Sequence, residues 1–218
     1  MTISHRKLLF LALVLVGLVV TGAGVASAQD VYKVNYFDNN GSNFLIGNTL
    51  FAAPDAKVRI DNPGLTYGNL CAMIYVFAAD QQLSECCGCI ETHNGLRKLS
   101  LGIDLTSNPL TGVHLKSGVI KVVSAAVNNG AGCDPTANVT PKANLRVWVT
   151  HIQDQSFSGS VTDSAPFISS LISSFPITET ESSDSTLGAT ELANLQAQCA
   201  FVNILGSGHG ICTCGSGD

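Results

Sequence analysis

Hydrophobic and polar residues alternate most regularly between Lys98 and Leu105. Leu99, Leu101, Ile103 and Leu105 occupy every second position, and polar or small residues stand between them. Successive side chains of a strand point to opposite faces of a sheet. The alternation therefore predicts a strand over this stretch, with one buried face and one face in contact with solvent.

Five further segments are rich in β-branched and aromatic residues and end near turn sequences. They are residues 31–37, 57–60, 71–77, 119–126 and 145–152. Cys71–Phe77 is apolar throughout, which predicts a central strand covered on both faces. Six short strands separated by turns predict an all-β fold, an antiparallel β-sandwich that is loosely immunoglobulin-like. The specific immunoglobulin signature is missing, because the single tryptophan, Trp148, does not fall between sheet cysteines.

The pattern changes after Ile152. Residues 156–186 are dense in serine and threonine, which is typical of a connecting segment. Between 187 and 205 the apolar residues recur at helical spacing, and Gly206 then supplies a helix stop. One face of this predicted helix carries Leu192, Leu195, Cys199 and Val202. We expect the helix and the Cys-x-Cys tail after it to pack on the sandwich.

The N-terminus has the three parts of a secretory signal peptide. Residues 5–7 are basic, residues 8–20 are apolar, and Ala26-Ser27-Ala28 forms a small-residue cleavage site. We therefore expect cleavage after Ala28 and a secreted or periplasmic mature protein. The predicted organisation is a signal peptide at 1–28, a β-sandwich core at 29–155, a Ser/Thr-rich connecting segment at 156–186, and a helix and tail at 187–218.

Charge narrows the range of partners. The leader holds two of the 11 basic residues and none of the 16 acidic ones, so the mature net charge is 9 − 16 = −7. An acidic surface repels nucleic acid and anionic lipid, and we expect neither as a partner. No second apolar run approaches the roughly 20 residues that span a bilayer, so we expect no membrane insertion after signal cleavage.

Eight cysteines, all downstream of the leader, are the most informative residues of the chain. An exported protein with an even number of cysteines usually oxidises them into structural disulfides. The cysteines are Cys71, Cys86, Cys87, Cys89, Cys133, Cys199, Cys212 and Cys214. Their pairing is not determined by the sequence, since eight cysteines allow 105 connectivities.

The spacing nevertheless constrains the geometry of these disulfides. Adjacent residues of an extended segment point to opposite faces, so Cys86 and Cys87 should serve two different partners. Cys212 and Cys214 share a face and can reach the Cys86–Cys89 cluster together if the tail folds back over the sheet. Cys199 lies on the core side of the predicted helix and is expected to join helix and sheet.

Metal binding is the alternative to disulfides. Cys86, Cys87, Cys89, Cys212 and Cys214 offer soft sulfur ligands for copper or zinc. His209 stands close by in sequence and would complete the set. The spacing fits no standard zinc knuckle or ribbon, and an oxidising compartment favours disulfides, so we expect no cofactor on the leading interpretation.

Catalytic motifs are scarce in this sequence. It has neither the His-Glu-x-x-His of zinc proteases nor the Gly-x-Ser-x-Gly nucleophile elbow. The four histidines of the mature chain are interpreted as surface or strand-end residues: His93, His114, His151 and His209. We therefore assign no catalytic residue and expect a non-enzymatic protein.

Three segments together resemble a known group of proteins. They are Asn69–Phe77, the Glu-Cys-Cys-Gly-Cys run at 85–89, and the Gly-Ile-Cys-Thr-Cys-Gly run at 210–215. The chain is similar to secreted cysteine-rich proteins of soil bacteria. The resemblance covers most of the mature chain through its cysteine framework, implies bacterial export, and implies no activity or catalytic residues.

Three hypotheses about function follow from the sequence. The leading one is a secreted, disulfide-stabilised, non-enzymatic module with a structural or surface-associated role, including an adhesive or self-assembling subunit that associates through its N-terminal strand around Tyr32–Phe37. In the more usual alternative, that strand pairs within its own sheet. The second hypothesis is the copper- or zinc-binding protein described above. The third is a secreted hydrolase with an unrecognised site.

Overall fold

The computed structural model describes residues 30–41, 43–46, 49–107, 114–127, 132–137, 139–153, 177–205 and 212–215. The predicted signal peptide, His209 and the part of the connecting segment before residue 177 lie outside these ranges. Among the described residues, no helix has the length and apolar character that crossing a membrane requires.

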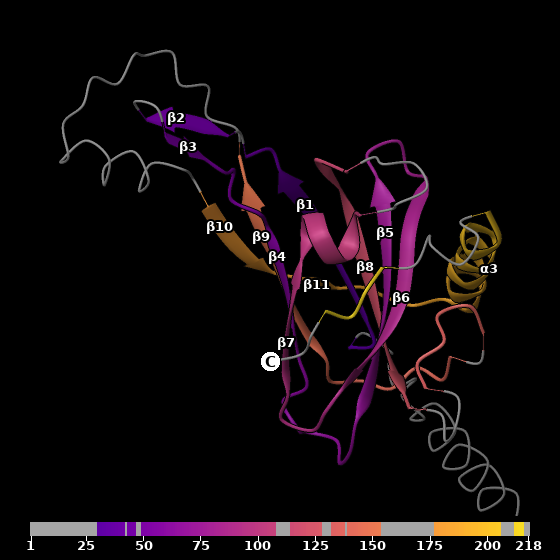
Figure 1. Cartoon of the computed structure of the whole chain (residues 1–218). Helices are drawn as coiled ribbons and strands as arrows, with labels where there is room; N and C mark the ends of the chain where they lie inside the picture. The colour runs from indigo at the N-terminus through magenta and orange to yellow at the C-terminus, as the bar shows by residue number, and fades with distance from the viewer. Residues whose placement is uncertain are drawn as a thin grey trace, which may run out of the picture.

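Nine strands form one curled sheet (Figure 1). They are β1 (Tyr32–Asn39), β4 (Lys57–Asp61), β5 (Leu70–Ala78), β6 (Leu83–Glu91), β7 (Leu96–Ser100), β8 (Ser117–Ala126), β9 (Arg146–Ile152), β10 (Ile177–Glu181) and β11 (Ser183–Asp184). The order is β6-β5-β8-β1-β9-β4-β7, while β10 pairs with β9 and β11 with β1. A separate hairpin joins β2 (Phe44–Ile46) to β3 (Thr49–Phe51).

The predicted antiparallel sandwich is wrong in its arrangement, although the mostly-β fold with a C-terminal helix is confirmed. Nine of the described strands belong to one curled sheet. The sheet is mixed, because β1 runs parallel to β9 where Asp38 and Asn39 pair with His151 and Ile152. Alternation along a strand tells which side chains are buried. It does not tell whether the buried face meets a second sheet or the inside of the same curled sheet.

Two local predictions also need correction. The strand expected through Leu105 ends at Ser100, and Leu101–Leu105 form a short π-helical turn, η1. Side chains hold this turn: Asp104 Oδ2 accepts from the Ser100 amide at 2.7 Å, and Ser100 Oγ accepts from the Ile103 amide at 3.0 Å. Leu101 and Leu105 are buried while Ile103 is 71% exposed, so the turn keeps two of the three leucine or isoleucine side chains in the core.

The Ser/Thr-rich segment was predicted to be a connection only, but its last part belongs to the sheet. β10 pairs with β9 over five residues, and β11 pairs with β1 over two. Thr178 and Thr180 fit a strand because β-branched residues favour extended backbone. The predicted helix is confirmed as α3, Ala189–Leu205.

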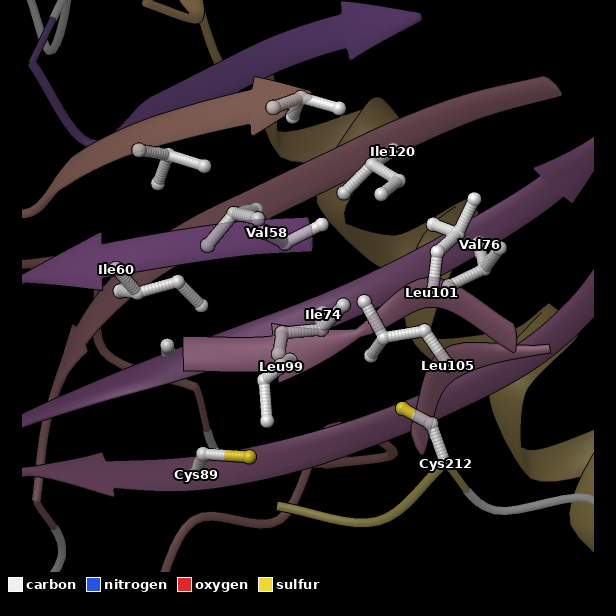
Figure 2. Packing of buried hydrophobic residues seen from close by; sticks show 14 of the residues in the cluster. Val58, Ile60, Ile74, Val76, Cys89, Leu99, Leu101, Leu105, Ile120 and Cys212 are labelled. Carbon is white, nitrogen blue, oxygen red and sulfur yellow. The ribbon is translucent and has the colours of Figure 1, made fainter. Parts of the chain in front are cut away.

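The central strand β5 separates two hydrophobic clusters, as its uninterrupted apolar sequence predicted. Leu70 through Phe77 are all buried. The inner cluster fills the curl of the sheet and contains Val58, Ile74, Leu99, Leu105 and Ile120 (Figure 2). The outer cluster lies under α3 and contains Met73, Tyr75, Val123, Leu195 and Cys199. Burial of this apolar surface on both faces of β5 is the main stabilising term of the fold.

Candidate functional site

The cysteines of β6 face both sides of the sheet. Cys86 belongs to the outer hydrophobic cluster beneath α3. Cys87 and Cys89 belong to the inner cluster. This confirms the prediction that Cys86 and Cys87 serve different partners, and its cause is the two-residue period of an extended strand.

All eight cysteines form disulfides, in four pairs. The pairs are Cys71–Cys133, Cys86–Cys199, Cys87–Cys212 and Cys89–Cys214. Cα separations between 5.2 and 5.8 Å lie in the normal range for disulfides. The predicted staple from helix to sheet through Cys199 is confirmed, as is the joint attachment of Cys212 and Cys214 to the β6 cluster.

The C-terminal tail bridges the gap between β6 and β7, the two end strands of the curled sheet, and we call this gap the seam. β6 and β7 follow one another in sequence yet stand at opposite ends of the strand order. The tail lies between them and contacts both sides (Figure 1). Its two disulfides hold it to β6, and Thr213 donates through its amide to Asp104 O at 2.8 Å, next to β7. Two sheet edges that would otherwise expose unpaired backbone groups are thereby joined.

Arg97 of β7 ties the same seam by hydrogen bonds. Its Nε donates to Glu91 Oε1 at 2.7 Å, its Nη2 donates to Ile90 O at 2.8 Å, and its Nη1 donates to Cys214 O. Glu91 is only 2% exposed, and this burial raises the pKa of its carboxyl while Arg97 opposes the rise. One guanidinium thus links β6, β7 and the tail, using the several fixed donors that only arginine has. No pattern in the sequence indicated this role.

Gly88 is required by the disulfide that covers it. A Cβ added at this position would lie 2.0 Å from Cys133 O and 2.9 Å from Cys133 Cβ. The loop that carries Cys133 therefore packs directly on the backbone of β6, between Cys87 and Cys89. This close approach explains the glycine of the Cys-Cys-Gly-Cys run.

The structure divides the predicted metal-ligand set. The sulfur atoms of Cys87, Cys89 and Cys214 lie within 4.8 Å of one another, whereas Cys86 is on the opposite face of β6 and cannot join them. Cys212 is bonded to Cys87, and His209 lies outside the described residues. Every one of these sulfur atoms is in a disulfide, and thiolates, the form that binds metal, exist only after reduction.

His151 lies at the end of strand β9, as expected, but it is buried and not a surface residue. His93 and His114 are exposed, but His151 is 1% exposed, and its ring stacks on Tyr36 with centroids 4.1 Å apart. Its Nε2 lies 2.7 Å from Thr180 Oγ1, and its Nδ1 has no hydrogen-bond partner among the described residues. Burial lowers the pKa of His151, and the nearby Asp38 carboxylate opposes that effect.

Comparison with known proteins adds no assignment: no protein-family model, no curated protein and no solved structure matches this chain.

We predict that the two tail disulfides support each other. With one in place, the other closes a ring of only a few residues, so replacing Cys87 and Cys212 by alanine should cost about 2 kcal/mol. Replacing all four tail cysteines also opens a ring of about 15 residues, bounded by the Cys86–Cys199 bridge, and should cost about 5 kcal/mol in total.

Chemical denaturation measures these losses of stability. Amide hydrogen exchange at β6 and β7 reports whether the seam between these strands stays closed. As a control, replacing Cys71 and Cys133 should leave amide protection at β7 unchanged, because that bridge lies on the outer face. Equal exchange at β7 in the two-cysteine and four-cysteine tail variants would contradict closure of the seam by the tail.

Arg97→Met should destabilise the protein by about 3–5 kcal/mol, because it leaves the buried Glu91 carboxylate without its counter-charge. The matched control is Lys98→Met on the same strand, which is exposed and should change stability by no more than about 0.5 kcal/mol. Adding Glu91→Leu to Arg97→Met should recover much of the loss. Failure of the second substitution to recover stability would show that the ion pair is not the cause.

Acid should destabilise the native state through His151. The unfolded chain takes up a proton on this side chain near pH 6.5, and the folded chain does so only at lower pH, so the free energy of unfolding falls as pH drops below about 6.5. The raised pKa of Glu91 acts in the opposite direction and is common to all variants. His151→Gln should therefore lose less stability than wild type between pH 7.5 and 5.0 in denaturant titrations. His93→Gln, at an exposed site, should behave like wild type, and parallel pH profiles for all three proteins would refute the assignment.

Proposed function

We propose that this protein is an exported, non-enzymatic module with a structural or surface-associated role in an oxidising compartment, outside the cell or in the periplasm. The observation that carries the proposal is the complete pairing of the eight cysteines, two pairs of which fasten the tail across the sheet seam. Disulfides persist in such compartments and are rare in the cytosol. The signal-peptide pattern at residues 1–28 supports the same location.

The pairing of buried charged side chains between different elements supports a structural role. Glu91 is paired with Arg97 across the seam, and the nearly buried Lys33 is paired with Asp30 and Asp184. Both groups connect elements that are distant in sequence: Lys33 connects β1 with β11, and Arg97, beside Glu91, connects the consecutive strands β6 and β7 with the C-terminal tail. Charges placed in this way hold strands in register, which is what a module that must survive outside the cell needs.

Self-association by donation of the N-terminal strand is a less favoured form of this proposal. β1 pairs with β8 over seven residues and occupies a central position in the sheet of its own chain. Donation to a neighbour would require withdrawing a central strand. The more usual alternative, pairing within the chain, is the arrangement observed.

A second candidate function, binding of copper or zinc, is favoured by one observation. Three sulfur atoms on β6 and the tail lie within 4.8 Å of one another, close enough for their thiolates to share one soft metal ion. This function requires the reduced protein. In that form, a metal ion bound by Cys87, Cys89 and Cys214 would hold the tail to β6 in place of the two disulfides.

The intact mass of the natively secreted protein, alkylated without reduction, separates the two candidates. We expect a mass about 8 Da below the reduced form, two hydrogens for each of four bridges, with no alkyl adducts and no stoichiometric metal. The N-terminus should be Gln29. Alkylated cysteines, or copper or zinc at one equivalent, would overturn the structural proposal in favour of the metal-binding one.

A further inference from the structure

A groove runs along the outside of the sheet over β1. It has a volume of ≈ 620 Å³ and is lined by residues of β1, β8, β10 and β11 and by Ser185. The size is in the range of sites for small organic ligands. Its walls include the apolar Val34, Tyr36 and Val119, and the polar Thr180, Glu181 and Asp184.

The groove contains a fixed aromatic surface. Tyr36 is 56% exposed, yet its ring is stacked on His151 at 4.1 Å. His151 is itself 1% exposed, and its Nε2 lies 2.7 Å from Thr180 Oγ1 on β10. A buried ring supported by a neighbouring strand therefore holds the tyrosine in place. Because Tyr36 is already ordered, a ligand that stacks on it loses little side-chain entropy on the protein side.

The charges of the groove restrict its ligand. Glu181 lines the groove with a carboxylate, whereas the carboxylate of Asp184 is paired with Lys33. No lysine or arginine is among the described lining residues of the groove. An anionic ligand such as a phosphate or a uronate would be repelled. A neutral ligand rich in hydroxyl groups suits the Glu181 carboxylate, because a carboxylate accepts hydrogen bonds from more than one hydroxyl.

We propose that this groove binds a neutral polysaccharide chain, with the C–H face of one sugar unit stacked on the ring of Tyr36 and its hydroxyl groups donating to Glu181. The face of an aromatic ring carries partial negative charge and attracts polarised C–H groups. The apolar side chains of Val34 and Val119 extend this surface beneath the sugar. The combination of an ordered aromatic ring, an apolar floor and one acidic hydrogen-bond acceptor distinguishes a neutral sugar from an anionic one.

This inference rests on the proposed function, because an exported, surface-associated protein is the one that meets cell-wall or matrix polysaccharide. Different experiments can refute the proposed function and the proposed carbohydrate site. The disulfide and metal content test the module itself, and carbohydrate binding by the oxidised protein tests the groove.

The test is native affinity electrophoresis of the oxidised mature chain, residues 29–218, in gels that contain hydroxyethylcellulose, glucomannan, xylan or the anionic polygalacturonate. We expect retardation by at least one neutral polysaccharide and none by polygalacturonate. Tyr36→Ala should weaken that retardation at least tenfold, while Tyr36→Phe, which keeps the ring, should stay within threefold of wild type. Glu181→Gln keeps the shape of the groove and should weaken binding severalfold, with an unchanged thermal midpoint.

The matched control is Tyr67→Ala, since Tyr67 is 95% exposed and does not line the groove. We expect this variant to bind as wild type does. Retention of wild-type affinity by Tyr36→Ala, an equal loss in Tyr67→Ala, or no retardation by any neutral polysaccharide would overturn the proposal.

Discussion

The open seam of the curled sheet is the constraint on which the rest of the structure depends. A sheet that curls without closing leaves two edges of unpaired backbone next to its hydrophobic interior. Here the edges belong to β6 and β7, and the inner cluster lies between them. The C-terminal tail bridges these two edges, with two disulfides on the β6 side and hydrogen bonds with Asp104 and Arg97 on the other. Closure therefore depends on residues at the far end of the chain.

β6 organises this closure because consecutive residues of a strand face opposite sides. Cys86 fixes α3 to the outer face, while Cys87 and Cys89 fix the tail to the inner face. Gly88 leaves room for the Cys133 loop in the same short run. The four consecutive residues from Cys86 to Cys89 thus contact or bond to the helix α3, the Cys133 loop and the tail. Such dense cross-linking holds the sheet in one curvature, and the groove over β1 is built on that sheet.

β1 connects the stapled core to the proposed ligand groove. One edge of β1 pairs with β8, and the other meets β9 at Asp38 and β11 at Lys33. Tyr36 on this strand stacks on the buried His151 of β9. The aromatic surface is consequently part of the sheet and not of a surface loop, which gives it the fixed orientation that stacking requires. The sequence signalled Tyr36 only as part of an N-terminal strand, and it gave His151 no distinguishing mark.

The sequence by itself determined the elements whose evidence is local: the strands near 31–37, 71–77, 119–126 and 145–152, the helix α3, and the assignment of the cysteines of β6 to two faces. These depend on side-chain period and residue type, which act over a few positions. Only the tertiary structure decided the parallel pairing of β1 with β9, the turn at Leu101–Leu105, the connectivity of the disulfides and the burial of His151. Each of these depends on which distant segments meet, and a carboxylate such as Asp104 or a guanidinium such as Arg97 shows no preferred partner until the chain has brought one within hydrogen-bond distance.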